Sequence, residues 1–155
     1  MNLQQLQTNT SIDKWQIGHG KQEWHGEFAA TRPVRIFLVE DSPHVRDLLL
    51  DFLNVPHEVE IVGHADNENE SVAAVLADPV DVVIVDLKIR EGSGMGVIAK
   101  LRNANLQPQP KIIVFSNHHF DAIRQRAMQL GADHFFDKST EYEALRAEVC
   151  SGRAH

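Results

Sequence analysis

Three carboxylates, a hydroxyl and an amine stand at the ends of short apolar runs in this chain of 155 residues. The acidic pair Glu40 and Asp41 follows VRIFLV, and Asp86 follows VDVVIV. Ser116 ends the run IIVFS, and Lys138 follows HFFD. In open α/β sheets, ligands bind beyond the carboxyl ends of the strands. If the runs are strands of one sheet, these five side chains are candidates for a reactive site.

The residue types indicate transfer of a phosphoryl group to an aspartate. Clustered carboxylates repel one another and favour a hard cation with oxygen ligands, and Mg²⁺ commonly combines one or two carboxylates with waters and phosphate oxygens. Asp86 can act as the nucleophile and carry an acyl phosphate. The cation and Lys138 would stabilise the phosphoryl oxygens, and Ser116 would donate a hydrogen bond to one of them. Taken singly, each residue is equally a helix cap, a turn residue or a solvated charge.

The elements that must position these groups follow from the pattern of the chain. From residue 33 onward, short apolar runs alternate with helical patterns, which is typical of a parallel sheet covered on both faces. We expect strands at about 34–39, 58–64, 80–85, 111–115 and 133–136, and later helices at about 68–77, 94–103, 119–130 and 140–150. Right-handed crossovers then favour a five-stranded doubly wound sheet.

Local signals indicate where the helices begin and end. Ser42-Pro43 predicts an N-cap followed by proline at the first helical position, and Gly131 predicts the end of the helix over 119–130. The helix after Pro43 is expected to bury one face at three- and four-residue spacing, made of Val45, Leu48, Leu49, Phe52 and Leu53.

Composition excludes several classes of function. The formal net charge of −7 argues against direct binding of nucleic acid or of anionic membranes. No run approaches the roughly 20 apolar residues of a membrane span, and the start of the chain lacks the layout of a signal peptide. The single cysteine, Cys150, excludes an internal disulfide and fits a reducing compartment. We therefore expect a cytoplasmic protein without membrane insertion.

The organisation along the chain is simple. Residues 1–32 are rich in glutamine, contain both tryptophans, and show weak periodicity, so we interpret them as a flexible N-terminal arm, with an ordered docking segment as the alternative. Residues 33–150 form the domain, and 151–155 form a short tail. Because so few residues follow the last expected helix, we expect a stand-alone protein whose output is protein contact.

With these residues in view, the chain resembles the receiver domain of two-component response regulators over about residues 33–150. The matching motifs are LVEDSP, VIVDLKIREGSGMGVI, VFSN and FFDKS. The resemblance implies a flavodoxin-like sheet in the strand order 2-1-3-4-5 with helices on both faces. It also implies that Asp86 accepts a phosphoryl group from phosphohistidine on a sensor histidine kinase or a histidine phosphotransfer protein. A downstream protein target would read that state, and homodimer formation stays open.

The same resemblance assigns the metal ligands. Asp41 and Asp86 would bind Mg²⁺ together with the backbone carbonyl of Lys88, and Glu40 would act largely through water. The chain would catalyse only its own phosphorylation and dephosphorylation, so we expect no other enzymatic activity.

The resemblance also identifies a switch. Phe135 stands three residues before Lys138, where the family carries its switching aromatic. Phosphorylation is expected to draw Ser116 toward the phosphoryl group and Phe135 inward, which would change the surface of the last two helices and the strand between them. Lys88 and His118 occupy positions that tune the family's dephosphorylation rate, and both are potential cations.

Three departures from the family pattern favour an alternative. Arg90 stands where proline is usual, Ser139 replaces the proline that commonly follows the lysine, and Asn117 is larger than the usual residue at its position. They motivate the hypothesis of a pseudo-receiver that binds proteins without being phosphorylated. The non-proline residue after the lysine also puts the family's cis peptide bond there in doubt, because non-proline cis bonds cost about 2.5–4 kcal/mol.

Other readings fit the sequence poorly. The glycines of GSGMG, residues 92–96, do not match the dinucleotide pattern and come six residues after the strand. An aspartate-dependent hydrolase would need a second carboxylate beside Asp86, but leucine and lysine follow. The nine histidines show no metal-ligand spacing.

Overall fold

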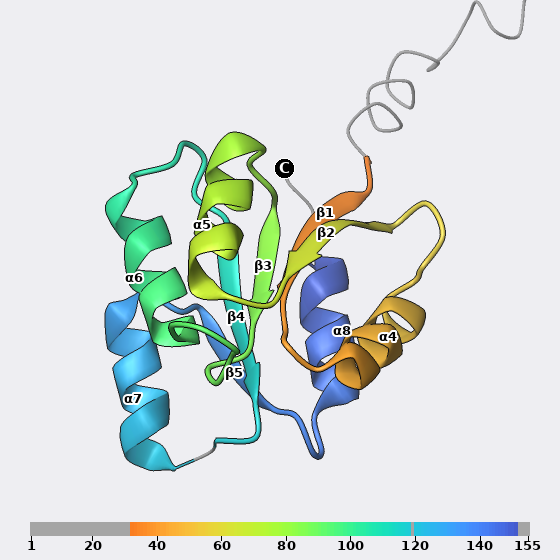
Figure 1. Cartoon of the computed structure of the whole chain (residues 1–155). Helices are drawn as coiled ribbons and strands as arrows, with labels where there is room; N and C mark the ends of the chain where they lie inside the picture. Colours follow the sequence, from red (N-terminus) through yellow and green to blue (C-terminus); the bar gives the residue numbers. More distant parts are fainter. Residues whose placement is uncertain (1–31, 119, 152–155) are drawn as a thin grey trace, which may run out of the picture. The chain divides into compact units, whose positions relative to one another are not determined.

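The computed structural model describes residues 32–118 and 120–151, so nearly all of the expected arm and tail lies outside the described residues. In this part of the chain, five strands alternate with five helices (Figure 1). They are β1 (Val34–Val39), α4 (Pro43–Phe52), β2 (Val59–Ala65), α5 (Glu68–Ala77), β3 (Val82–Val85), α6 (Gly94–Asn103), β4 (Lys111–Ser116), α7 (Asp121–Leu130), β5 (His134–Asp137) and α8 (Tyr142–Ser151).

The sheet confirms the expected fold. All neighbouring strands are parallel, and their order is β2-β1-β3-β4-β5. The register places Val39 opposite Val85, and it places Ser116 opposite Asp137. The residues that follow β1, β3 and β5 therefore emerge at the same edge of the sheet, beside the last residue of β4.

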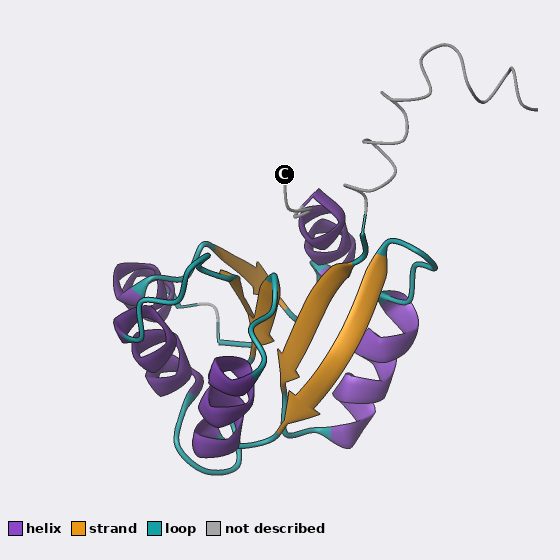
Figure 2. Cartoon of the chain, turned by 90° about the horizontal axis from the view of Figure 1, so that it is seen from above, coloured by secondary structure: helices purple, strands orange, loops and turns teal. Residues whose placement is uncertain are grey.

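Helices cover both faces of the sheet. Figure 2 shows α4 and α8 on one side and α5, α6 and α7 on the other. The central strand β3 is buried along its whole length and sends alternate side chains to the two layers. Val82 and Ile84 pack with Leu49 and Leu145, whereas Val83 and Val85 pack with Val97 and Ile98. Within the described ranges, no helix has the length and apolar character needed to cross a membrane.

The helix ends agree with the sequence signals, with one error in the burial pattern. The Ser42 hydroxyl accepts a hydrogen bond from the first turn of α4, and Gly131 ends α7 with a φ of 120°. Leu48, expected to be buried, is 44% exposed, whereas Leu49 and Leu53 reach the core. The apolar stripe of α4 is therefore wider than the face that contacts the sheet.

Helix α6 begins directly against the loop that carries Asp86. The backbone N–H of Gly94 donates to the carbonyl oxygen of Leu87 at 2.9 Å. A Cβ atom at Gly94 would lie 2.2 Å from the Asp86 carbonyl oxygen and 2.7 Å from the Leu87 Cα. Both contacts are with backbone, so only a residue without a side chain fits here.

We expect Gly94→Ala to lower the free energy of unfolding by about 1–3 kcal/mol, because the added methyl group must displace backbone in a packed region. Urea denaturation measures this change. Gly63→Ala is the matched control, since its new Cβ would meet only two carbons of the Phe37 ring, at 3.1 and 3.4 Å. Equal stability of the two variants would contradict the close packing of α6 on the loop that carries Asp86.

Candidate functional site

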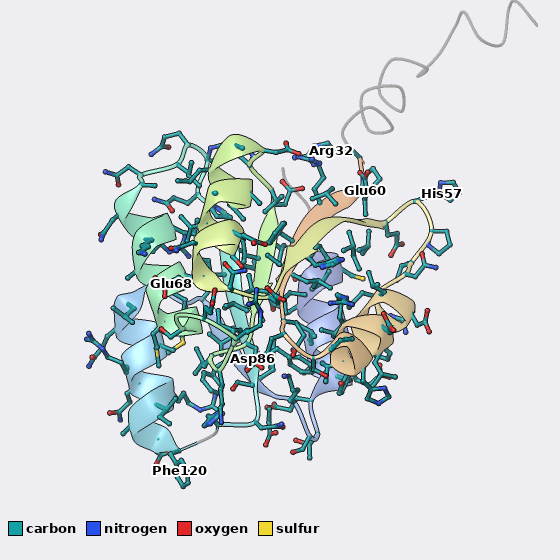
Figure 3. All side chains as sticks on the ribbon, in the orientation of Figure 1. Arg32, His57, Glu60, Glu68, Asp86 and Phe120 are labelled. Carbon is teal, nitrogen blue, oxygen red and sulfur yellow. The ribbon has the colours of Figure 1, made fainter. Side chains whose placement is uncertain are left out.

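The strand ends bring the predicted site residues together. Glu40 and Asp41 follow β1, Asp86 follows β3, Ser116 ends β4, and Lys138 follows β5. Figure 3 shows Asp86 in the loop region beyond the end of β3. One pocket of about 390 Å³ is lined by Glu40, Asp41, Asp86 and Lys138, which gives the buried Asp86 carboxylate a route to solvent.

Lys138 connects two of the carboxylates. Its ammonium group donates to Asp86 Oδ2 and to Glu40 Oε1, both at 2.8 Å, and its side chain is only 8% exposed. Burial by itself would lower the pKa of Lys138, but the hydrogen bonds from its ammonium to Asp86 and Glu40 outweigh burial and raise that pKa. Lys138 is therefore a cation at neutral pH.

Glu40 serves mainly to hold Lys138. Its carboxylate is buried, and the oxygen that does not contact Lys138 accepts the backbone N–H of Ser42 at 3.1 Å. Burial raises the pKa of Glu40, and the hydrogen bond from Lys138 opposes part of that rise. Both carboxylate oxygens are thus engaged by protein donors, and the expectation that Glu40 would act on a metal ion largely through water stays a prediction.

The donor set fits a divalent cation. Carboxylate oxygens of Glu40, Asp41 and Asp86 lie within 4.8 Å of one another, and no other such trio of acidic, histidine or cysteine residues occurs in residues 32–118 and 120–151. Three carboxylates beside one ammonium leave an excess of two negative charges. A hard cation with oxygen ligands, such as Mg²⁺, is the group that balances this excess.

Ser116 is held by a neighbour that the sequence did not reveal. Its hydroxyl is fully buried and accepts the backbone N–H of His118 at 3.2 Å. The Nδ1 atom of the same histidine lies 3.4 Å from the hydroxyl oxygen. Spacing alone could not show this contact, because it depends on the turn that follows β4.

Phe135 is already inward. Its side chain is 5% exposed, and the Arg124 guanidinium carbon lies 4.5 Å from the centre of its ring. Arg124 also donates to the Phe135 carbonyl oxygen at 3.0 Å. The ring thus already occupies an inner position in this structure, and the expected movement of this aromatic on phosphorylation stays a prediction.

Arg90 makes contacts that proline cannot make. Its backbone N–H donates to the Asp66 carbonyl oxygen at 3.1 Å, and proline has no such donor. Its guanidinium also pairs with both Asp66 carboxylate oxygens, at 2.8 and 3.1 Å. Hydrogen bonds from Arg90 and then from Asn67 lower the pKa of Asp66 to about 2. Arg90, which stands where the family usually has proline, thus connects the loop that carries Asp86 to the end of β2.

Ser139 closes a different turn from the one that proline would make. The cis peptide bond in the described part of the chain precedes Pro108, so the bond between Lys138 and Ser139 is trans. The backbone N–H and the hydroxyl of Ser139 both donate to Asp137 Oδ1, at 2.8 and 2.7 Å. These bonds fix the connection to α8 and leave Lys138 directed into the pocket.

Replacing Lys138 tests its role between the two carboxylates. We expect Lys138→Met to lower the free energy of unfolding by about 3 kcal/mol at neutral pH, because it leaves buried carboxylates without a partner. Adding Glu40→Gln should restore part of the loss, since a neutral amide costs less to bury than an unpaired carboxylate. Urea denaturation of both variants measures this. An equal loss in the single and double variants would show that Glu40 and Lys138 are not coupled.

Comparisons with known proteins agree with this geometry. The family model of the response regulator receiver domain matches residues 36–150. A protein-glutamate methylesterase/protein-glutamine glutaminase of Agrobacterium fabrum is 36% identical over 99 residues, which are 63% of this chain and 28% of that protein. This chain thus spans little more than a quarter of the length of that relative.

Solved structures of receiver domains share the fold. The signal receiver domain of the putative response regulator NarL from Mycobacterium tuberculosis superposes with a TM-score of 0.71 at 27% identity, covering 80% of this chain and 99% of that one. The response regulator domain of CheB from Thermotoga maritima gives a TM-score of 0.66 at 23% identity, covering 77% and 92%. Because the family match spans most of the sequence, the chain belongs to the response regulator receiver domain family of two-component signalling.

Proposed function

We propose that this chain accepts a phosphoryl group from phosphohistidine onto Asp86 in a Mg²⁺-dependent reaction, and signals through a changed protein-binding surface. The observation that carries this proposal is the contact of 2.8 Å between the Lys138 ammonium and Asp86 Oδ2, made in a pocket that also contains Asp41. Membership of the receiver family supports it, because receiver domains interact with histidine kinases and with effector proteins or domains.

The proposed transfer is a single displacement. One carboxylate oxygen of Asp86 attacks the phosphorus of phosphohistidine, a P–O bond forms while the P–N bond breaks, and the imidazole leaves and takes up a proton. Asp41, Asp86 and the Lys88 carbonyl would hold Mg²⁺, which supplies neutralisation of the phosphoryl oxygens when bound. Lys138 adds a second positive charge at the acceptor.

Glu40 keeps Lys138 in the pocket during this change. Once Asp86 carries an acyl phosphate, the oxygen that Lys138 contacts no longer belongs to a free carboxylate. The second ion pair of Lys138, to Glu40 at 2.8 Å, remains and holds the ammonium near the new phosphoryl oxygens. The buried pair therefore preorganises the charge that the product needs.

Ser116 is the proposed link to the surface. A phosphoryl oxygen would accept the Ser116 O–H, and the Nδ1 atom of His118, at 3.4 Å, is the neighbour with which it would compete for that proton. The backbone N–H of His118 donates to the same hydroxyl and can stay bound. β4 leads directly into the connection before α7. Since Phe135 is already inward, we propose that the change passes through Ser116 and His118 to α7, to the edge strand β5, and from β5 to α8. A protein partner would recognise that face, and the chain would act without further enzymatic activity.

The chemistry is tested by intact-mass spectrometry after incubation with acetyl phosphate, in Mg²⁺ or in EDTA. We expect one phosphoryl adduct in Mg²⁺ and none in EDTA, and we expect Asp86→Asn to abolish it because the nucleophile is lost. Asp51→Ala, an exposed carboxylate on α4, is the control that should keep the adduct. An adduct on Asp86→Asn would move the acceptor elsewhere. No adduct with acetyl phosphate or with a phosphohistidine protein would favour the pseudo-receiver.

The link through Ser116 is tested separately. We expect Ser116→Ala to accept the phosphoryl group, as seen by mass, but to lose the amide chemical-shift changes in α7 that phosphorylation causes in the wild type, because alanine has no hydroxyl to donate. Ser116→Thr keeps the hydroxyl and should keep the changes. Unaltered changes in the alanine variant would exclude Ser116 from the signalling route.

A further inference from the structure

The loop between β3 and α6, residues 86–93, is called the acceptor loop. We propose that Asp66 and Glu68 hold the far part of this loop, after Ile89, and so position the Lys88 carbonyl and set the affinity of the site for its divalent cation. This inference rests on the proposed function, because it concerns the same site. Four residues that join the acceptor loop to the region after β2 are called the loop clasp: Asp66, Glu68, Arg90 and Ser93.

The near side of the acceptor loop is anchored on the sheet. The backbone N–H of Asp86 donates to the Val39 carbonyl oxygen at 2.9 Å, and the Leu87 carbonyl oxygen accepts from Gly94 at 2.9 Å. Leu87 and Ile89 are buried, whereas the Lys88 side chain between them is exposed. The Lys88 backbone N–H has one long contact, 3.5 Å to Asp86 Oδ1, so the direction of the Lys88 carbonyl also depends on what holds the residues after Ile89.

Arg90 and Glu91 are held by the segment between β2 and α5. Arg90 binds the Asp66 backbone and carboxylate, and the backbone N–H of Glu68 donates to the Glu91 carbonyl oxygen at 2.9 Å. An isolated parallel bridge joins Asn67 and Glu91. The loop is thus paired like a short extra strand, although Asp66 and Arg90 are 24 residues apart.

Glu68 completes the clasp with a carboxylate that is largely covered. One of its oxygens accepts the Ser93 backbone N–H at 2.9 Å, and the other pairs with Lys100 at 2.8 Å. Its hydrogen bonds with Lys100 and then Ser93 lower the pKa of Glu68, so it is a carboxylate at neutral pH. Glu68 is the first residue of α5, whereas Asp86 follows β3; Figure 3 labels both residues.

Gly92 in the loop and Gly96 in the first turn of α6 leave room for the Glu68 side chain. A Cβ atom at Gly92 would lie 2.5 Å from Glu68, and one at Gly96 would lie 2.4 Å from it. Gly92 also has a φ of 81°, which side chains rarely adopt. Gly92 and Gly96 are therefore explained by the approach of Glu68 to the start of α6, whereas Gly94 between them is required by the backbone of Asp86 and Leu87.

These contacts leave Lys88 and Ile89 between two anchored points. The Asp66–Arg90 pair is exposed, with side chains 39% and 53% accessible, so removing it should have little effect on global stability. A local shift of the loop would, however, move the Lys88 carbonyl relative to Asp86 and Asp41. Cation affinity is thus the property that distinguishes a positioning role from a purely structural one.

The test is calorimetric titration of the full chain with MgCl₂. We expect Asp66→Asn to weaken Mg²⁺ binding by about two- to fivefold, the range that the loss of an exposed ion pair allows. The charge-swapped variant Asp66→Arg with Arg90→Asp should recover most of that loss. Asp78→Asn is the matched control, because it breaks the exposed Arg35–Asp78 pair near the starts of β1 and β3 and should leave the affinity unchanged.

Thermal unfolding and mass spectrometry separate the outcomes. Unchanged melting temperature with weakened Mg²⁺ binding in Asp66→Asn supports the clasp. If Asp66→Asn binds Mg²⁺ as tightly as the unmutated chain, the clasp is overturned, even if the unmutated chain takes up a phosphoryl group. An equal loss of Mg²⁺ affinity in Asp66→Asn and Asp78→Asn also overturns it. A wild type that binds Mg²⁺ but never accepts a phosphoryl group contradicts the proposed function, while the affinities still decide on the clasp.

Discussion

Lys138 lies between Glu40 and Asp86, and the rest of the site depends on this buried ion pair. The lysine follows β5, and its side chain reaches past the end of β4 to Asp86, which follows β3, and to Glu40, which follows β1. Such a reach requires parallel strands whose ends are level, because side chains alternate between faces and a shift by one residue would turn each group away. The side chains of β3 alternate between the two helical layers, and this alternation has a chemical consequence: it fixes which way the residue after Val85 can point.

The site keeps more negative charge than one lysine can neutralise, and this is costly for a protein of marginal stability. The fold accommodates the cost by placing each carboxylate differently. Glu40 is buried and bound on both oxygens, whereas the Asp41 carboxylate makes no hydrogen bond or ion pair with the described residues. One acid thus supports the lysine, and the other stays available to a cation. A site with three equivalent carboxylates would have neither property.

Much of this arrangement was predictable because it follows from strand order. The runs before Asp86 and Lys138 identified the strands, and a doubly wound sheet brings their carboxyl ends together. The contacts of Arg90 and Ser116 were not predictable, because they depend on loop turns and on partners that no periodic pattern indicates. Arg90 was visible as a departure from the family pattern, but its partner, Asp66, lies in a different loop 24 residues away. The exposure of Leu48 was missed for a related reason: a helical stripe shows which side is apolar, but not how wide the contact with the sheet is.

The contacts also constrain how a charge change at Asp86 can travel. Adding a phosphoryl group makes the pocket more negative, and Lys138 is already bound to Glu40 and cannot leave without unpairing a buried carboxylate. Phe135 is packed under Arg124, whose guanidinium holds both its ring and its carbonyl oxygen. The Ser116 hydroxyl, in contrast, has only contacts of 3.2 and 3.4 Å with His118. Because a hydroxyl can accept and donate at once, the backbone N–H of His118 can stay bound while the Ser116 O–H turns to a phosphoryl oxygen. Since hydrogen bonds to charged acceptors are roughly twice as strong as neutral ones, we expect this turn to be the rearrangement that the site opposes least. On the proposed function, the motion would begin at the turn between β4 and α7.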